Sequence, residues 1–155
     1  MKVRGKCINL QHYTIAFSMK LLHFQPIAGK ALEILDTILH TQEVTSCKKE
    51  FSTLRLVCEE LVVNVVDYAY PEEVQAEGYL DIEIERAVDS IVIRFKDGGT
   101  PFNPLARDMP DITLPMEERR IGGLGIFLTI KKMDHVFYDY VNNENVLTVK
   151  KTITE

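Results

Sequence analysis

The fold is decided by one stretch of the chain, Glu59-Glu60-Leu61-Val62-Val63-Asn64-Val65-Val66-Asp67-Tyr68-Ala69-Tyr70-Pro71. Its polar residues Glu60, Asn64 and Asp67 are spaced i, i+4 and i+7, so a helix places them along one face among apolar neighbours. The helix is predicted to begin near Lys48 and to end before Pro71, because proline disfavours helical geometry at the residue that precedes it.

Acidic side chains on an otherwise apolar helix require an interaction partner if they are buried. Removing an ionised carboxylate from water costs several kcal/mol unless a cation or a hydrogen-bond donor interacts with it. Mg²⁺ would supply such a partner, since it takes oxygen ligands and keeps waters while it bridges to substrate phosphates. This chemistry suits a single side-chain oxygen such as that of Asn64. A solvated polar stripe is the alternative interpretation.

Two short strands and a glycine-containing turn follow the helix. Residues 80–85 and 91–96 each alternate apolar and polar side chains, which predicts a hairpin that turns near Asp89. The run Asp97-Gly98-Gly99 stands where the second strand ends. A carboxylate there can accept hydrogen bonds from the amino group of a ligand, and the glycines allow the backbone to approach it closely. A plain turn is the competing interpretation, since Asp-Gly is common in turns.

A second glycine run precedes a later helix. Residues 98–122 contain four prolines and no periodicity, so they are predicted to form a long structured loop. The run Gly122-Gly123-Leu124-Gly125 then leads into an apolar helix predicted over 124–133. Backbone N–H groups at a glycine-rich helix N-terminus, together with the helix dipole, favour a bound phosphate. The run lacks the Lys-Ser or Lys-Thr pair of a Walker loop, and an ordinary hinge is the alternative.

The remaining segments complete a layered fold. Residues 14–17 favour a strand, and an amphipathic helix is predicted over about 26–40. Strands over 136–141 and 146–152 are predicted to form a closing hairpin around Asn142-Asn143. Hairpins on one side and helices on the other predict an α+β fold, a two-layer sandwich with a mainly antiparallel mixed sheet and helices on one face.

Composition narrows the classes of function. The chain has 155 residues, 46% hydrophobic and 26% charged, and no repeat or linker, so residues 1–155 are predicted to form one domain. A net charge of -5 argues against nucleic acid or anionic lipid as a direct partner. The apolar runs are too short to cross a membrane and the start does not resemble a signal peptide, so we expect a cytoplasmic protein. The cysteines are expected to be reduced thiols, with Cys58 in the core.

Taken together and in order, three motifs resemble the N-box and the two glycine boxes of the GHKL ATPases: Glu60-x-x-x-Asn64, Asp97-x-Gly99 and Gly123-x-Gly125. The likeness covers about residues 54–151 and includes the order of the predicted elements. Within that superfamily the compact size and the runs around Asn64 and Gly123 are similar to the anti-sigma serine kinases. The resemblance implies the Bergerat fold of the histidine kinase-like ATPases.

The resemblance implies a site for ATP and Mg²⁺. In such a site Asn64 would ligate Mg²⁺, and Asp97 would accept a hydrogen bond from the adenine amino group. Residues 102–121 would form the ATP lid. The other nucleotide-binding positions that the resemblance implies are Gly99, Gly123, Leu124, Gly125 and Arg120. Arg119 is a second candidate for the lid arginine, and a solvated charge run is the alternative for both arginines.

The resemblance also implies a reaction and partners. Glu60 would be the general base that takes the proton from a serine hydroxyl as the γ-phosphoryl group transfers. The family substrate is a serine of an anti-anti-sigma protein, and the charge added there would free the kinase to hold a sigma factor. A homodimer is the family expectation.

Two other functions stay open on the sequence. A non-catalytic ATP-binding module that sequesters a protein partner is favoured by the uncertain position of the lid arginine. The detached catalytic domain of a sensor histidine kinase would use the same pocket. That class needs a dimerising helical hairpin that bears a histidine, whereas the stretch before the N-box is predicted to contain a strand and one helix.

Overall fold

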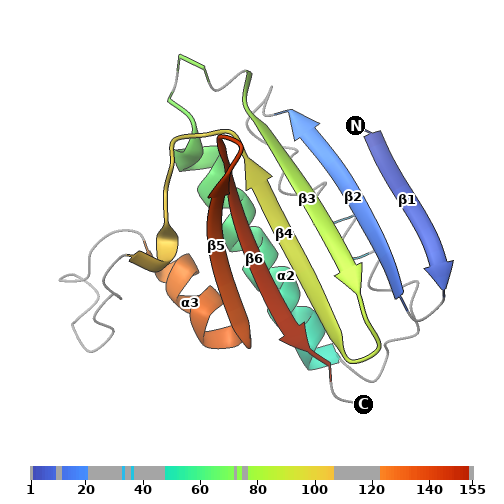
Figure 1. Ribbon diagram of the computed structural model, residues 1–155. Helices are drawn as coiled ribbons and strands as arrows, with labels where there is room; N and C mark the ends of the chain where they lie inside the picture. Colours follow the sequence, from blue (N-terminus) through green and yellow to red (C-terminus); the bar gives the residue numbers. More distant parts are fainter. Residues whose placement is uncertain are drawn as a thin grey trace, which may run out of the picture.

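The computed structural model describes residues 2–9, 12–20, 33, 36, 48–71, 73–74, 77–106 and 123–153. Among these residues one six-stranded sheet is formed, in the order β1-β2-β3-β4-β6-β5, and each neighbouring pair is antiparallel (Figure 1). The strands are β1 (Lys2–Asn9), β2 (His12–Lys20), β3 (Tyr79–Arg86), β4 (Ser90–Asp97), β5 (His135–Val141) and β6 (Glu144–Thr152).

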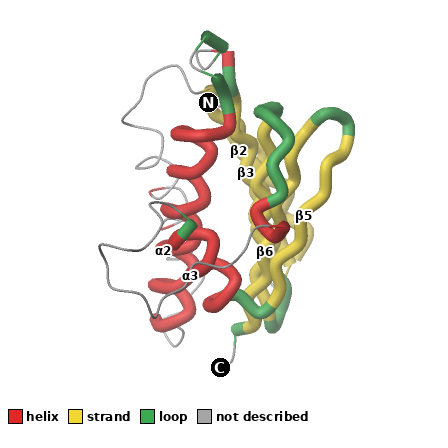
Figure 2. Tube along the Cα trace, turned by 90° about the vertical axis from the view of Figure 1, so that its left-hand side faces the viewer, coloured by secondary structure: helices red, strands yellow, loops and turns green. Residues whose placement is uncertain are grey.

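Helices cover one face of this sheet. Helix α2 (Lys48–Asn64) continues into the π-helical turn η1 (Val65–Ala69), and α3 (Leu124–Lys132) packs against α2. Seen edge-on, the helices form one layer and the strands the other (Figure 2). The predicted two-layer α+β sandwich with a mainly antiparallel sheet is therefore confirmed, although the sheet was also predicted to be mixed and all its described strand pairs are antiparallel. Within the described part of the chain, no helix is long and apolar enough to cross a membrane.

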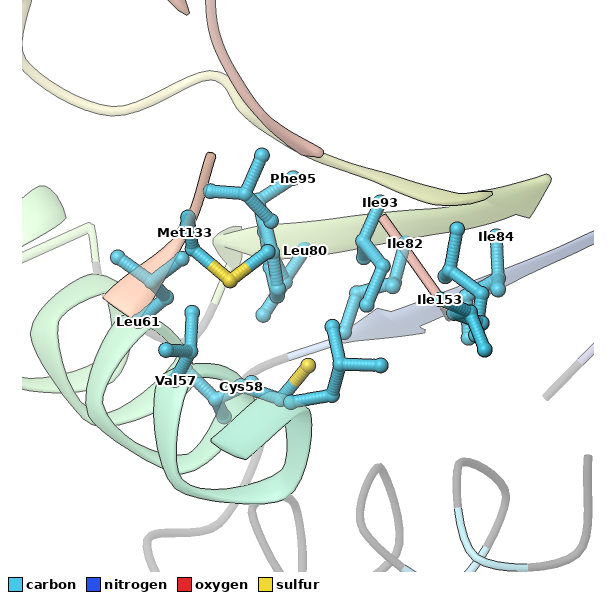
Figure 3. Packing of buried hydrophobic residues seen from close by; sticks show 14 residues of the cluster. Val57, Cys58, Leu61, Leu80, Ile82, Ile84, Ile93, Phe95, Met133 and Ile153 are labelled. Atoms are coloured by element: carbon cyan, nitrogen blue, oxygen red, sulfur yellow. The ribbon is translucent and has the colours of Figure 1, made fainter. Parts of the chain in front are cut away.

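The core lies between α2 and the central strands (Figure 3). Its buried side chains are Leu54, Val57, Cys58, Leu61, Val62, Leu80, Ile82, Ile84, Ile91, Ile93, Phe95, Met133, Val149 and Ile153. The apolar members of β3 and β4 alternate along each strand, as a sheet with one covered face requires. Cys58 is buried as predicted, and this burial raises the pKa of its thiol to about 12.

Polar side chains occupy the opposite face of β3 and β4. The Arg94 guanidinium donates to both Glu83 and Glu85 at 3.1 Å, and Lys96 donates to Glu83 at 3.3 Å. All four side chains are partly exposed, so water screens these ion pairs and each contributes little to stability. These side chains are the polar members of the alternating pattern from which the hairpin was predicted.

The predicted turns are confirmed, and the N-terminal strand was missed. Asn142 and Asn143 have φ angles of 54° and 64°, as expected for a type I′ hairpin turn. Strand β2 extends the strand predicted over 14–17, whereas no strand was predicted for β1. The helix predicted over 26–40 lies mostly outside the described residues. Within it Glu33 and Asp36 are helical, and Asp36 pairs with Arg55 of α2 at 3.3 Å.

The long helix departs from its predicted form at its C-terminal end. It is α-helical to Asn64 and then widens into η1, whereas Tyr70 is extended with φ -118° and ψ 134°, as expected before Pro71. A π-helical turn advances by a smaller angle per residue than an α-helix. Asp67 consequently leaves the line of Glu60 and Asn64 and is exposed, while those two side chains are half-buried. The expectation that all three share one face is therefore wrong for Asp67.

Leu61→Ala is expected to lower the free energy of unfolding by about 2–5 kcal/mol, because the Leu61 side chain is 2% exposed and its removal leaves a cavity. Val63→Ala is the matched control on the same helix. Its side chain is 38% exposed, so its substitution is expected to change stability by about 0.5 kcal/mol or less. Urea unfolding of both variants measures the difference, and equal effects would contradict the packing of α2 described above.

Candidate functional site

The three sequence clusters meet at the C-terminal half of the long helix. Gly125, at the start of α3, lies so close to α2 that a Cβ atom added there would overlap the Glu60 side chain. Gly99, beyond the end of β4, lies equally close to the carbonyl group of Ala69 in η1. The Thr100 N–H donates to that carbonyl at 2.8 Å. The absence of a side chain at both glycines permits this approach, so residues far apart in sequence surround one stretch of helix.

Asn64 lies at the junction of α2 and η1, one turn beyond Glu60. Its Nδ2 atom is buried and has no hydrogen-bond partner among the described residues. A buried polar group left in this way costs about 1–3 kcal/mol, so a partner supplied by a ligand would be favourable. The amide also carries an oxygen of the kind that Mg²⁺ binds. The side chain therefore fits the position of a metal ligand.

Asp97 is the last residue of β4 and is 6% exposed. Its Oδ1 atom accepts hydrogen bonds from the Gly99 N–H and from Nδ2 of Asn145, both at 2.9 Å. No donor within the described part of the chain reaches Oδ2. Burial raises the pKa of the Asp97 carboxyl. The hydrogen bonds from Asn145 and Gly99 lower this pKa, but burial has the larger effect. The result is a buried carboxyl group with one oxygen available to a ligand.

Sequence reasoning missed Asn145, the residue that connects Asp97 to the loop. It stands opposite Asp97 in the pairing of β4 with β6 and is 6% exposed. No motif includes it, and the strand there was predicted to begin one residue later. The informative signal is the register between β4 and β6, because that register brings an amide next to a carboxylate.

A second unpredicted connection runs through Tyr70. Its hydroxyl donates to the Tyr79 carbonyl at 2.8 Å and accepts from the N–H groups of Gly98 at 2.8 Å and Tyr79 at 3.2 Å. These bonds attach the end of the long helix to the start of β3 and to the turn after Asp97. The position of that turn therefore depends on Tyr70 as well as on the contact of Gly99 with Ala69.

The sequence of this chain has relatives among known proteins. Residues 28–151 match the family described as the histidine kinase-like ATPase domain. The chain belongs to this family. The matched region begins upstream of residue 54, so it also includes most of the stretch for which the N-terminal helix was predicted.

Individual relatives of this histidine kinase-like ATPase are protein kinases by name. The chain is 30% identical over 116 residues to the serine-protein kinase RsbW of Listeria monocytogenes serovar 1/2a, a match that covers 65% of this chain and 73% of the relative. The serine-protein kinase RsbW of Listeria innocua serovar 6a is 29% identical with the same coverage. The resemblance stated from the motifs is confirmed.

Of the glycine run Gly122–Gly125, the structure describes the residues from Gly123 onward. Gly123 has φ 86°, a left-handed conformation that favours glycine, and Leu124 at the first helical position is 53% exposed. The predicted lid is described over 102–106, which include the short 3₁₀ turn Pro104–Ala106. The rest of the lid, with Arg119 and Arg120, lies outside the described residues.

Replacing Asp97 by Asn is expected to stabilise the nucleotide-free ATPase at neutral pH. Because burial raises the pKa of Asp97, the folded chain binds this proton more tightly than the unfolded chain does. Stability then falls as the pH rises from the ordinary value of 3.8 through the folded-state pKa. Asp97→Asn removes the buried charge and keeps an oxygen for both donors, so its advantage should be full at about pH 7 and shrink toward pH 4.

Urea unfolding of Asp97→Asn and the wild type across this pH range measures the effect. Asp139→Asn, at an exposed position on β5, is the control and should show no such pH-dependent gain. An Asp97→Asn variant that is less stable than the wild type at neutral pH would contradict the inferred desolvation of this carboxylate.

Proposed function

We propose that this histidine kinase-like ATPase is an ATP- and Mg²⁺-dependent serine kinase of the partner-switching type. The observation that carries the proposal is the contact between Gly125 and Glu60. The N-terminal turn of α3 is the place where backbone N–H groups would hold phosphate. Glu60 touches that turn and therefore lies next to the end of the nucleotide where a phosphoryl group would leave. A module that only binds ATP has no need of a carboxylate there.

In this proposal the nucleotide spans the site from Asp97 to α3. Asp97 would accept a hydrogen bond from the adenine amino group through Oδ2, the oxygen to which no described residue donates. Asn64 would hold Mg²⁺, which when bound neutralises charge on the phosphates. The nucleotide would also contact Gly99, Gly123, Leu124, Gly125 and Arg120, with residues 102–121 as the lid.

Glu60 performs the proton chemistry of the proposed reaction. The serine oxygen of the substrate attacks the γ-phosphorus, the bond from that phosphorus to the bridging oxygen breaks, and ADP leaves. Glu60 accepts the proton of the serine hydroxyl, a role worth about 10²–10⁴-fold in rate. The names of the relatives support serine as the phosphorylated residue.

The proposed substrate is an anti-anti-sigma protein. Phosphorylation adds up to two negative charges to the substrate serine. This charge would make the substrate dissociate from the kinase, which could then bind a sigma factor. We further propose that the chain acts in the cytoplasm as a single domain, 1–155, and that it forms a homodimer, with no direct contact to nucleic acid or membrane.

Calorimetric titration with ATP and ADP, with and without Mg²⁺, tests the nucleotide site. The wild type is expected to bind ATP, and Asp97→Asn to bind it at least about tenfold more weakly, because the acceptor for the adenine amino group is altered. Asn64→Ala is expected to lose the Mg²⁺-dependent part of the affinity. A wild type that binds no nucleotide at millimolar concentration would refute the proposal.

Glu60→Gln tests catalysis with a substitution of nearly equal size. It is expected to keep ATP affinity and to lower the rate of labelled γ-phosphate transfer to a cognate anti-anti-sigma protein by about 10²–10⁴-fold. Glu59→Gln, the exposed neighbour, is the control and should transfer at the wild-type rate.

The outcome also separates the alternatives. ATP binding without any transfer in the wild type would favour a non-catalytic module that sequesters its partner. A phosphorylated product that is labile in acid would identify phosphohistidine and favour the histidine kinase reading, because phosphoserine is stable in acid. Normal transfer by Glu60→Gln would exclude Glu60 as the general base.

A further inference from the structure

The side-chain amide of Asn145 has only one possible orientation. Its Oδ1 atom accepts hydrogen bonds from the Phe102 N–H at 3.0 Å and from the Tyr138 hydroxyl at 2.8 Å. Its Nδ2 atom faces acceptors alone, which are Asp97 Oδ1 at 2.9 Å, the Thr100 carbonyl at 3.2 Å and the Gly99 carbonyl at 3.4 Å. A flipped amide would direct its NH₂ group at a backbone N–H and its oxygen at a carboxylate. The surroundings therefore hold Asn145 as a donor to Asp97.

This donor determines which hydrogen bonds Asp97 can offer. With N–H groups from Asn145 and Gly99 directed at it, Oδ1 of Asp97 has no room for a proton of its own. Any proton on this carboxyl group would have to sit on Oδ2, the oxygen that no donor among the described residues reaches. Oδ2 is an acceptor while Asp97 is ionised and becomes a donor when Asp97 is protonated. The ionisation of Asp97 thus decides what kind of ligand atom the site accepts.

We propose that Asn145 determines the purine selectivity of the nucleotide site, because its Nδ2 donation to Oδ1 holds Asp97 as an ionised acceptor. Oδ2 then receives the 6-amino group of an adenine and is mismatched with the 6-oxo group of hypoxanthine or guanine, which is itself an acceptor. Asn145 is a positioning residue, since it acts on the base through Asp97. This inference rests on the proposed ATP site and adds to it the residue that selects the base.

The other titratable groups around Asp97 do not provide the same control. The negative charge of Glu144, on the same strand as Asn145, raises the pKa of Asp97 and so opposes ionisation. Tyr70 and Tyr138 also lie within electrostatic range, and burial raises the pKa of both phenols, so they stay neutral near pH 7. The hydrogen bonds that favour the charged form come from Asn145 and Gly99, and of these Asn145 alone acts through a side chain.

Binding of ATP and of inosine triphosphate, each with Mg²⁺, to the full chain tests this inference. Inosine triphosphate presents an oxygen acceptor where ATP presents an amino donor. Asn145→Ala is expected to reduce the ratio of ATP affinity to inosine triphosphate affinity by about tenfold or more, as for the loss of one hydrogen bond to a charged group. The ratio should fall further as the pH is lowered, because protonated Asp97 can donate to the 6-oxo group.

Tyr138→Phe is the matched control. It removes one hydrogen bond of Asn145 but leaves the Nδ2 donation to Asp97, so the affinity ratio should stay at the wild-type value. If Asn145→Ala and Tyr138→Phe weaken both nucleotides equally, with a ratio that does not depend on pH, Asn145 has only a structural role and the inference is overturned.

For Asn145→Asp, ATP binding is expected to depend on pH in the direction opposite to that expected for Asn145→Ala. Two carboxyl groups at hydrogen-bond distance share one proton at lower pH, and the shared proton restores a donor to Oδ1 of Asp97. ATP affinity of this variant should therefore rise as the pH falls, while the selectivity of Asn145→Ala declines in the same direction of pH. An Asn145→Asp variant whose ATP affinity does not depend on pH would also overturn the inference.

Failure of the ATP site itself would be recognised separately. A wild type that binds neither nucleotide refutes the proposed function and the inference together. A wild type that binds ATP well above inosine triphosphate, with variants that do not change the ratio, refutes the inference alone.

Discussion

The site depends on close approach of backbone to one helix. Gly99 reaches the carbonyl of Ala69, and Gly125 reaches the side chain of Glu60, at distances that a Cβ atom would forbid. The helix can accept these contacts because its apolar side chains are buried against the sheet and it cannot move away without opening the core. A carboxylate turn and a helix N-terminus are consequently held against the same two turns of helix.

The same geometry buries polar groups whose burial destabilises the folded protein. Asp97 is buried with its pKa raised, and Nδ2 of Asn64 is buried without a partner in the described part of the chain. A native protein can contain such destabilising groups when a bound ligand compensates for their cost. Groups of this kind are therefore common in binding sites. The π-helical turn that follows Asn64 belongs to the same class of feature, since such turns are often found at functional sites.

Asn145 connects the site to the start of the predicted lid. Its amide joins Asp97 to the backbone of Phe102, which is the first residue of the predicted lid, and to Tyr138 on β5. Asn145 is therefore a hydrogen-bond partner both of Asp97, which would bind the base, and of Phe102, at the start of the loop. Occupation of the site by adenine would act on both through that single side chain.

Local patterns in the sequence determined much of this protein. Alternation in β3 and β4, the proline at 71 and the two asparagines of the last hairpin each act on neighbouring residues, so the elements and turns could be predicted. The order of the motifs was enough to identify the family. Tertiary structure alone decided the π-helical turn that displaces Asp67, the contact of Gly125 with Glu60, and the position of Asn145 beside Asp97. These features arise from packing and strand register between segments distant in sequence, and no local pattern carries that information.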